Sequence, residues 1–401
     1  MNVLQAKRLE LLTALDAAKT KLERNKLGQF ATAPGVSGEM VEYVLAHIAR
    51  PDIRYLEPGF GTGTFFNSLL QQVAVNLTGD MHPKANRHQL TAARGYEVDP
   101  HYADPIADLY DDTQLDLRVE DYTEAKPEPF DLILCNPPCV RHHHMDGVKK
   151  VALADDMAAR CKLRPSGLTG LYNYFIMTRE AWLSDDGLAG WLVPSEFLDV
   201  NYGVVVKTFL LQKVTLTRIH LYRSEDVQFD DALVSSAVVW YRKGKPAADH
   251  TVELSYGGSL LKPAYSQTVA HGSLNPASKW TRQIRKGEAP TKPIVLLDNT
   301  QARLKDFFDV KRGIATGDNN FFVLTEDQAN LCGIPQNLLT PILPSPRHLK
   351  SNIVESNMDG QGFLIKTECA VLVYIIRISY TLWVLPFVDK CAGRLVKHTQ
   401  N

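Results

Sequence analysis

The sequence predicts an α/β fold built on a parallel, doubly wound sheet. From Arg54 onward, short apolar runs bounded by turn residues alternate with stretches of helical spacing. The run LIL at 132–134 is continuously apolar, which is typical of a strand buried on both faces of a parallel sheet. Strands that alternate with helices favour a parallel sheet covered by helices on both faces.

The expected elements follow from spacing and from helix-breaking residues. Leucines at helical spacing predict an amphipathic helix over 3–23 that ends before Gly28. A second helix is expected after Pro34, over about 36–48, and others after the strand-like segments at 55–58 and 95–100. Further strands are expected within 115–122, 130–138, 191–198 and 235–243.

Length and composition set broad limits. The 401 residues allow two domains, each with its own core. Lys+Arg 44 against Asp+Glu 45 gives a net charge of -1, so net charge does not imply nucleic-acid binding, while a local basic groove stays open. Six cysteines form no dense framework and the N-terminus lacks a signal-peptide core, which together predict a cytoplasmic protein.

The C-terminal part of the chain has a different pattern. The strand pattern weakens after Trp240, and we therefore expect three parts: an N-terminal helix in 1–26, a first domain in 27–245 and a second domain in 246–401. Residues 370–388 are almost wholly apolar. Arg377 near the middle and Pro386 near the end favour a buried pair of strands over a membrane span.

A glycine-rich turn is the first motif that indicates a ligand. EPGFGTGTFF at 57–66 has the predicted context of strand, tight turn and helix, and its glycines let the backbone approach a ligand closely. Glu97 ends a later strand, where a carboxylate can accept both ribose hydroxyls of a nucleoside. Asp121 ends the next strand, placed for the amine of an adenine, with Tyr122 beside it for stacking. Each acid alone could be a solvated strand end, but together they favour a nucleoside site.

A second motif lies at the end of the run 130–135. Pro137 and Pro138 cannot continue a strand ladder, so the chain must leave the sheet at Asn136. This makes a rigid elbow at the carboxyl end of a strand, where open α/β sheets bind their ligands.

These motifs resemble those of S-adenosylmethionine-dependent DNA adenine-N6 methyltransferases of restriction-modification type. The resemblance is carried by LGQFATAP (27–34), LEPGFGTGTF (56–65), GYEVDP (95–100), VEDY (119–122) and NPPCVRHHH (136–144). It covers about 27–245 and extends to 308–324, and the order of the motifs resembles the gamma arrangement. It implies a Rossmann-like catalytic domain followed by a target-recognition domain, which the apolar tail predicts to be curtailed.

The resemblance also implies roles for particular residues. Asn136 and Pro137 would accept the two N–H groups of a flipped-out adenine, on the Asn136–Cys139 elbow that includes Pro138. The residues expected to bind the cofactor S-adenosylmethionine are Gln29, Phe30, Thr32, Pro34, Glu57, Pro58, Gly59, Gly61, Gly63, Phe65, Glu97, Asp121 and Tyr122. The resemblance implies two partners, double-stranded DNA and a cognate restriction endonuclease. It implies association with the nucleoid and no membrane partner.

One position departs from the resemblance. The family usually has an aromatic residue after the two prolines that stacks on the flipped base, and here that residue is Cys139. Tyr202 is expected to supply a stacking wall instead, with Tyr172 and Tyr174 as alternatives.

Two basic segments are candidates for DNA contact. Arg141, next to three histidines, is expected in a loop that touches phosphates or is simply solvated. Zinc binding by this loop and its cysteines is disfavoured, because adjacent histidines in an extended loop point apart. Lys311 and Arg312 precede a Gly-Asp-Asn turn that suits either a DNA-reading hairpin or a plain surface hairpin.

Two other functions remain open from the sequence. The chain could be a related methyltransferase that acts on RNA or on protein glutamine, although such protein-modifying enzymes tend to lack a segment like 250–401. It could also be a degenerate homologue that binds cofactor or DNA without turnover, which Cys139 and the apolar tail would motivate.

Overall fold

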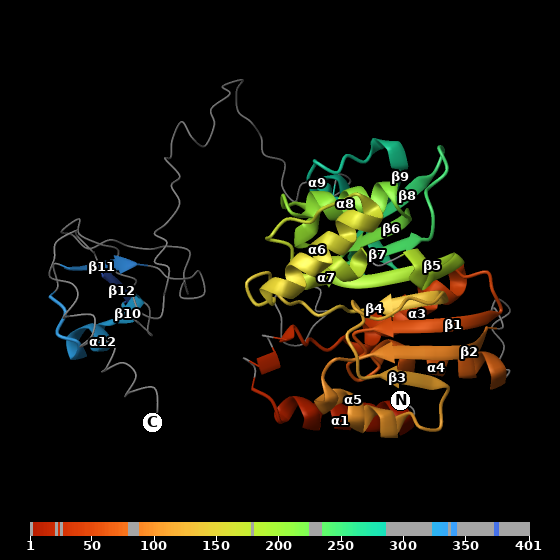
Figure 1. The fold of residues 1–401 in the computed structure, drawn as a ribbon, viewed down its shortest axis with the longest axis horizontal. Coiled ribbons are helices and arrows are strands. Elements are labelled where there is room, and N and C mark those ends of the chain that lie inside the picture. The colour runs from red at the N-terminus through yellow and green to blue at the C-terminus, as the bar shows by residue number, and fades with distance from the viewer. Residues whose placement is uncertain are drawn as a thin grey trace. The chain divides into compact units, whose positions relative to one another are not determined.

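The structure is a computed structural model that describes residues 3–20, 23–24, 27–78, 88–177, 180–223, 235–285, 323–335, 338–342 and 373–376. It divides into two compact units, Met1–Pro293 and Ile294–Asn401 (Figure 1). Each unit is described by itself.

The first unit is built on a nine-stranded sheet with the order β3-β2-β1-β4-β5-β7-β6-β8-β9. Its strands are β1 (Asp52–Pro58), β2 (Gln89–Tyr96), β3 (Leu115–Arg118), β4 (Phe130–Cys135), β5 (Leu183–Pro194), β6 (Thr215–Leu221), β7 (Ser236–Arg242), β8 (Thr251–Gly258) and β9 (Pro263–Ala270). Strands β3, β2, β1, β4 and β5 are mutually parallel, in the order of a doubly wound sheet. Strand β7 pairs antiparallel with both β5 and β6. The predicted Rossmann-like fold is confirmed.

Helices cover both faces of this sheet (Figure 1). They are α1 (Val3–Ala17), α3 (Pro34–His47), α4 (Thr64–Thr78), α5 (Pro100–Leu109), α6 (Gly147–Cys161), α7 (Leu171–Ile176), α8 (Gly203–Gln212) and α9 (Trp280–Ile284), with short 3₁₀ turns η1 (Glu180–Trp182), η2 (Ser195–Leu198) and η3 (His271–Ser273). The central strand β4 shows why a separate hydrophobic core forms on each face of the sheet. Leu132 and Leu134 join a core with α3, α4 and α5, whereas Ile133 and Cys135 join a core with α6, α7 and α8, because successive side chains of a strand point to opposite faces.

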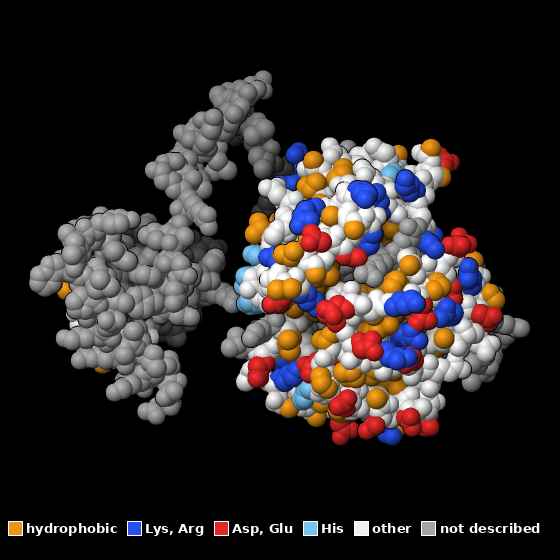
Figure 2. All heavy atoms as spheres, in the orientation of Figure 1, with side chains coloured by type: hydrophobic (Ala, Val, Ile, Leu, Met, Phe, Trp, Pro, Cys, Tyr) orange, Lys and Arg blue, Asp and Glu red, His pale blue; other side chains and the backbone are white. Residues whose placement is uncertain are grey.

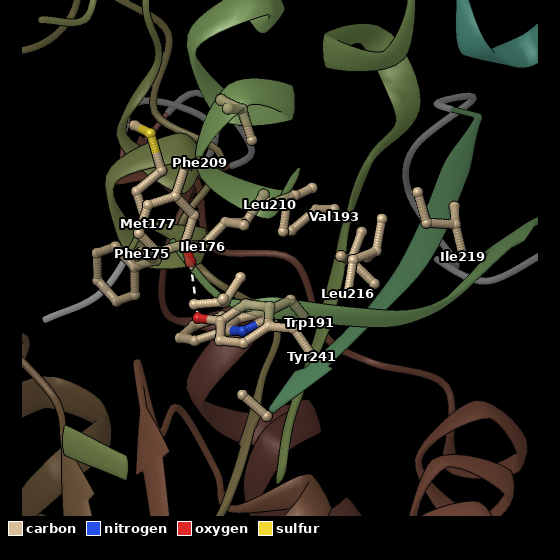
Figure 3. Packing of buried hydrophobic residues seen from close by; sticks show 14 of the residues in the cluster. Phe175, Ile176, Met177, Trp191, Val193, Phe209, Leu210, Leu216, Ile219 and Tyr241 are labelled. Atoms are coloured by element: carbon tan, nitrogen blue, oxygen red, sulfur yellow. Dashed lines mark hydrogen bonds between the residues drawn. The ribbon is translucent and has the colours of Figure 1, made fainter. Parts of the chain in front are cut away.

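The second of these cores is anchored by a buried hydrogen bond (Figure 3). The hydroxyl of Tyr241 on β7 donates to the carbonyl of Ile176, at the end of α7, over 2.7 Å. Trp191 on β5 stacks on Tyr241 with the ring centroids 6.4 Å apart. Helix α7, which follows the Asn-Pro-Pro elbow, is therefore fixed to the middle of the sheet.

The sheet extends past the domain boundary predicted near residue 245. Strand β8 pairs parallel with β6, and β9 pairs antiparallel with β8. By compactness the chain divides after Pro293. The sequence signal was weak here because β8 and β9 are joined by a short turn with no helix between them. The assignment of target recognition to 246–401 stays a prediction.

The second unit contains a small antiparallel sheet in the order β10-β12-β11. Its described elements are β10 (Val323–Thr325), α12 (Glu326–Leu331), β11 (Leu339–Ile342) and β12 (Val373–Ile376). Strand β12 belongs to the apolar segment in which strands were predicted, and the rest of that segment lies outside the described residues. Across the described ranges, no helix has the length and apolar character needed to span a bilayer.

Charged side chains of both signs are interspersed on the face shown in Figure 2. Lysine and arginine side chains lie beside aspartate and glutamate side chains over this face. This mixture matches the near-neutral net charge of -1. Any attraction for a polyanion on this face would therefore depend on local groups.

We expect Gly190→Ala to destabilise the first unit. Gly190 on β5 pairs with Trp240 on β7, and a Cβ at this glycine would lie 2.2 Å from the Trp240 ring. Overpacking of this kind costs about 1–3 kcal/mol, which urea unfolding followed by circular dichroism would measure. Gly147→Ala, at a glycine with open space around it, is the control and should change the free energy of unfolding by less than about 0.5 kcal/mol. Equal unfolding midpoints for the two variants would contradict the packing argument.

Candidate functional site

A cavity of about 280 Å³ opens at the carboxyl ends of the parallel strands. The turn after β1, the end of β2, the loop after β3 and the elbow after β4 all contribute to its wall. The predicted site residues that line it are Gln29, Phe30, Thr32, Glu57, Gly59, Gly61, Phe65, Glu97, Asp121, Tyr122, Asn136 and Pro138. Segments far apart in sequence meet here because the strands are parallel and end at one edge.

The glycine turn requires glycine at several positions. Gly59, Gly61 and Gly63 have φ of 67°, 53° and 67°, in the left-handed region that other residues rarely adopt. A Cβ at Gly59 would also lie 3.5 Å from Cδ of Pro138, on the elbow after β4. The turn and the elbow therefore approach each other closely at the cavity.

Glu57 is an internal anchor of the turn. Its side chain is 2% exposed and accepts hydrogen bonds from the Tyr55 hydroxyl at 2.7 Å and from the amides of Phe66 at 2.9 Å and Phe65 at 3.4 Å. These amides belong to the first turn of α4, which has no partners of its own for them. Burial raises the pKa of Glu57 to about 8, although the three donors and nearby Arg8 oppose the change.

Glu97 faces the cavity from the end of β2. It accepts hydrogen bonds from the amide of Gly61 at 2.8 Å and from the amide of Asp99 at 3.0 Å. Burial raises its pKa, and these amides partly offset the effect. A carboxylate can accept about four hydrogen bonds, so acceptor capacity remains for a ligand.

Asp121 lies in the loop after β3 and forms an ion pair with Lys149 of α6. The hydroxyl of Thr123 donates to it at 2.6 Å. Burial raises the pKa of Asp121, but the hydrogen bonds from Lys149 and Thr123 outweigh burial and hold the pKa below its usual value. Asp121 is therefore a charged acceptor, ready for an N–H donor in the cavity.

The side chain of Asn136 is held in one orientation. Its Nδ2 donates to the Phe30 carbonyl at 2.8 Å and to Oγ1 of Thr32 at 3.1 Å. A backbone carbonyl can only accept, which fixes the amide nitrogen on that side. Oδ1 of Asn136 is buried without a hydrogen-bond partner in the described structure. A buried acceptor left unpaired costs stability, and in native structures such a group calls for an explanation.

A backbone contact joins the segment 27–34 to the elbow. The amide of Cys139 donates to the carbonyl of Gly28 at 3.1 Å. Gly28 has φ of 67°, and a Cβ there would lie 2.5–2.7 Å from backbone atoms of Cys139 and Val140. Only glycine permits this approach, and it brings Phe30 and Thr32 to Asn136.

Cys139 is close enough to Glu196 of η2 to interact with it electrostatically, and Tyr202 follows η2 in the chain. The pKa of Cys139 is raised to about 12, chiefly by burial and further by Glu196, so the thiol is neutral and a poor nucleophile. The Tyr202 hydroxyl donates to Glu196 at 3.0 Å. Tyr202 is half-buried, while Tyr172 and Tyr174 are both 5% exposed and belong to the core. Of the three tyrosines, Tyr202 is the most accessible to a ligand beside Cys139.

Several predicted site residues do not line the cavity. Pro34 begins α3, the carbonyl of Pro58 accepts a hydrogen bond from the Cys135 thiol, and Gly63 packs against Phe60. Arg141 is exposed. The cavity wall also does not include Pro137, Cys139 or Tyr202. Lys311 and Arg312 lie outside the described residues, and within the described ranges no three His, Cys, Asp or Glu side chains cluster as a metal site.

Other residues of the cavity wall were missed from sequence. Leu12 and Asp16 of α1 line it, as do Tyr102 and Lys149. The predicted amphipathic helix gave no sign of what it covers, because partners such as Thr62 and Tyr102 lie 54 and 86 residues away in sequence. The only sequence signal for Lys149 as a cavity residue was its positive charge a short distance after the elbow in the chain.

Comparison with known proteins finds restriction-modification methyltransferases among the matches. The family model of the Eco57I restriction-modification methylase matches residues 84–228. The chain is 27% identical to Type II methyltransferase M.AccI of Acinetobacter calcoaceticus over 82% of its own length, and 25% identical to M.XamI of Xanthomonas campestris pv. amaranthicola over 74%. It spans 59% and 53% of those relatives. These matches confirm the predicted resemblance to restriction-modification methyltransferases.

A solved structure supports the fold. The type IIG restriction endonuclease BpuSI superposes with a TM-score of 0.50 at 15% identity, over 92% of this chain and 46% of that one. At this identity the likeness concerns the fold alone.

We expect the buried carboxyl of Glu57 to make stability depend on pH. Because its pKa is raised to about 8 in the folded state, the folded protein binds more protons than the unfolded chain between about pH 4.5 and 8. The free energy of unfolding should therefore fall as pH rises through this range. Glu57→Gln should remove this part of the pH dependence, as measured by urea unfolding at several pH values. Glu10→Gln, an exposed change on α1, is the control, and parallel profiles for all three proteins would contradict the expectation.

Proposed function

We propose that this chain is an S-adenosylmethionine-dependent DNA methyltransferase of a restriction-modification system, and that it methylates the N6 amine of adenine. The buried, unpartnered Oδ1 of Asn136 carries the proposal. It is an acceptor fixed at the cavity wall with nothing in the described protein to accept from. An amine with two N–H groups is the kind of substrate that such an acceptor fits. The relatives that match the chain are named Type II methyltransferases.

The cavity has the groups that S-adenosylmethionine needs. Glu97 is a buried carboxylate suited to the ribose hydroxyls. Asp121, kept charged by Lys149, is suited to the amine of the cofactor's adenine. Gly59 and Gly61 let the backbone approach, and Phe175 supplies an apolar wall. When bound, the cofactor supplies an electrophilic methyl group on its sulfonium.

The protein's contribution is to hold the target amine. Oδ1 of Asn136 accepts one N–H and the carbonyl of Pro137 accepts the other. Two acceptors on one amine draw its nitrogen towards tetrahedral geometry and free the lone pair that the adenine ring otherwise delocalises. This is catalysis by positioning and electrostatics on a rigid element. The hydrogen bonds to Phe30 and Thr32 keep the amide from rotating its nitrogen into that place.

The target base must leave the duplex, because its amine cannot reach the cavity while it is stacked. Tyr202 is the proposed stacking wall, next to Glu196 and on the side of Cys139. Arg141, exposed on the loop after the elbow, is a proposed phosphate contact. Lys311 and Arg312, outside the described residues, are proposed for the same role. A cognate restriction endonuclease is the proposed partner in the system.

Asn136→Ala should abolish methylation while cofactor binding is retained. Loss of one fixed acceptor should lower the rate at least ~100-fold. The measurement is genome-wide detection of N6-methyladenine in a methylation-free host, with cofactor binding measured by calorimetry on the purified protein. Asn275→Ala, at an exposed asparagine after η3, should methylate like the wild type. Methylation by the Asn136→Ala variant at the wild-type level would refute the assignment.

Cys139→Tyr should raise the methylation rate on DNA. A ring at this position would stack on the extruded base, and stacking is worth about 1–3 kcal/mol per base, or roughly tenfold in rate. Cys139→Leu adds bulk without an aromatic ring, so it is the control and should not raise the rate. Single-turnover kinetics on an oligonucleotide duplex would measure all three. A lower or unchanged rate in a folded Cys139→Tyr protein would show that stacking does not limit the reaction.

A further inference from the structure

Arg8 of α1 is a buried cation joined to the glycine turn. Its side chain is 0% exposed, and its Nη1 donates to Oγ1 of Thr62 and to Oγ1 of Thr64, each at 2.9 Å. Its Nε donates to Gln5 at 3.3 Å, and Gln5 in turn accepts a hydrogen bond from Asn67 of α4. Helix α1 is thereby bound to the start of α4 by a buried polar network.

These hydrogen bonds decide what the two threonine hydroxyls can do. A hydroxyl has one O–H to donate and two lone pairs that accept. Arg8 occupies an acceptor position on both Thr62 and Thr64, and in the described structure neither hydroxyl donates to another protein atom. Both threonines line the cavity. Two O–H donors are therefore available there, at the N-terminus of the fifteen-residue helix α4.

The charge around these donors is not balanced by the protein. Nη2 of Arg8 is buried without a hydrogen-bond partner in the described structure. Glu57 is the carboxylate that interacts with Arg8, but in the described structure it forms no direct ion pair with Arg8 and accepts from three donors of its own. The N-terminus of a helix adds partial positive charge. This end of the cavity therefore favours an anion.

We propose that Arg8 is a positioning residue that sets the hydroxyls of Thr62 and Thr64 to donate to the carboxylate of the cofactor's amino-acid part. The proposal rests on the proposed function, because it takes S-adenosylmethionine as the ligand. Arg8 acts through the two threonines, and α1 thereby becomes part of the binding site, as the cavity-lining Leu12 and Asp16 of the same helix also indicate.

The test compares two ligands that differ only in the carboxylate. S-Adenosylhomocysteine and its decarboxylated analogue are titrated by calorimetry into the wild-type chain, Arg8→Lys, Arg8→Met and the control Lys7→Met. Lys7 is an exposed cation one residue away on α1. We expect Arg8→Met to lower the affinity for S-adenosylhomocysteine about tenfold or more, because a hydrogen bond to a charged group contributes at least about a tenfold factor in affinity. The affinity for the decarboxylated analogue should change less than about twofold. The affinity of Arg8→Lys for S-adenosylhomocysteine should lie between those of the wild type and Arg8→Met.

Each outcome has one meaning. Equal loss of affinity for both ligands in Arg8→Met and Arg8→Lys would overturn the proposal and leave Arg8 as a residue that only joins α1 to the start of α4. Unchanged affinities would also overturn it. Unfolding midpoints of all four proteins, measured alongside, identify a loss that is due to misfolding, and Arg8→Lys keeps the comparison informative if Arg8→Met does not fold. Failure of the wild-type chain to bind S-adenosylhomocysteine would refute the proposed function itself.

Discussion

The hydrogen bond from Nδ2 of Asn136 to the carbonyl of Phe30 is the interaction on which the proposed chemistry depends. It requires that residues 27–34 reach the elbow after β4, and that approach requires Gly28 at a positive φ against Cys139. The bond also removes the ambiguity of an amide side chain, because a carbonyl cannot donate. A segment a hundred residues upstream thus determines which atom Asn136 presents to a substrate.

Three of the acidic residues that line the cavity, Glu57, Glu97 and Asp121, have different environments and therefore different uses. Glu57 is buried and accepts hydrogen bonds from the first amides of α4, which makes it a structural group. Glu97 is buried but retains acceptor capacity towards the cavity. Asp121 is kept charged by Lys149. Burial raises the pKa of all three carboxyl groups. Their hydrogen-bond and ion-pair partners differ, and these partners distinguish the internal anchor Glu57 from the two acceptors that can bind a ligand.

The sequence predicted most of the first unit and of its cavity, for a physical reason. Parallel strands are continuous apolar runs, and the residues that end them meet at one edge, so Glu97, Asp121 and Asn136 could be grouped before any coordinates. Arg8 and Lys149 could not be, because their contacts lie far away in sequence and neither residue type marks a site by itself. The boundary near residue 245 stays a prediction, and β8 and β9 continue the sheet beyond it with no helix between them.

We propose that cofactor binding and target recognition are carried by different parts of this chain. The cavity is lined by residues between Leu12 and Phe175, which all belong to the compact unit Met1–Pro293. The elbow and the proposed stacking residue Tyr202 belong to the same unit. The groups that would bind the cofactor and hold an amine are therefore assembled by one sheet and its helices, independently of residues 294–401. Sequence specificity depends on side chains placed in the grooves of DNA. Under the proposal that the second unit supplies those side chains, a change confined to it should alter which adenine is reached without altering how the amine is held.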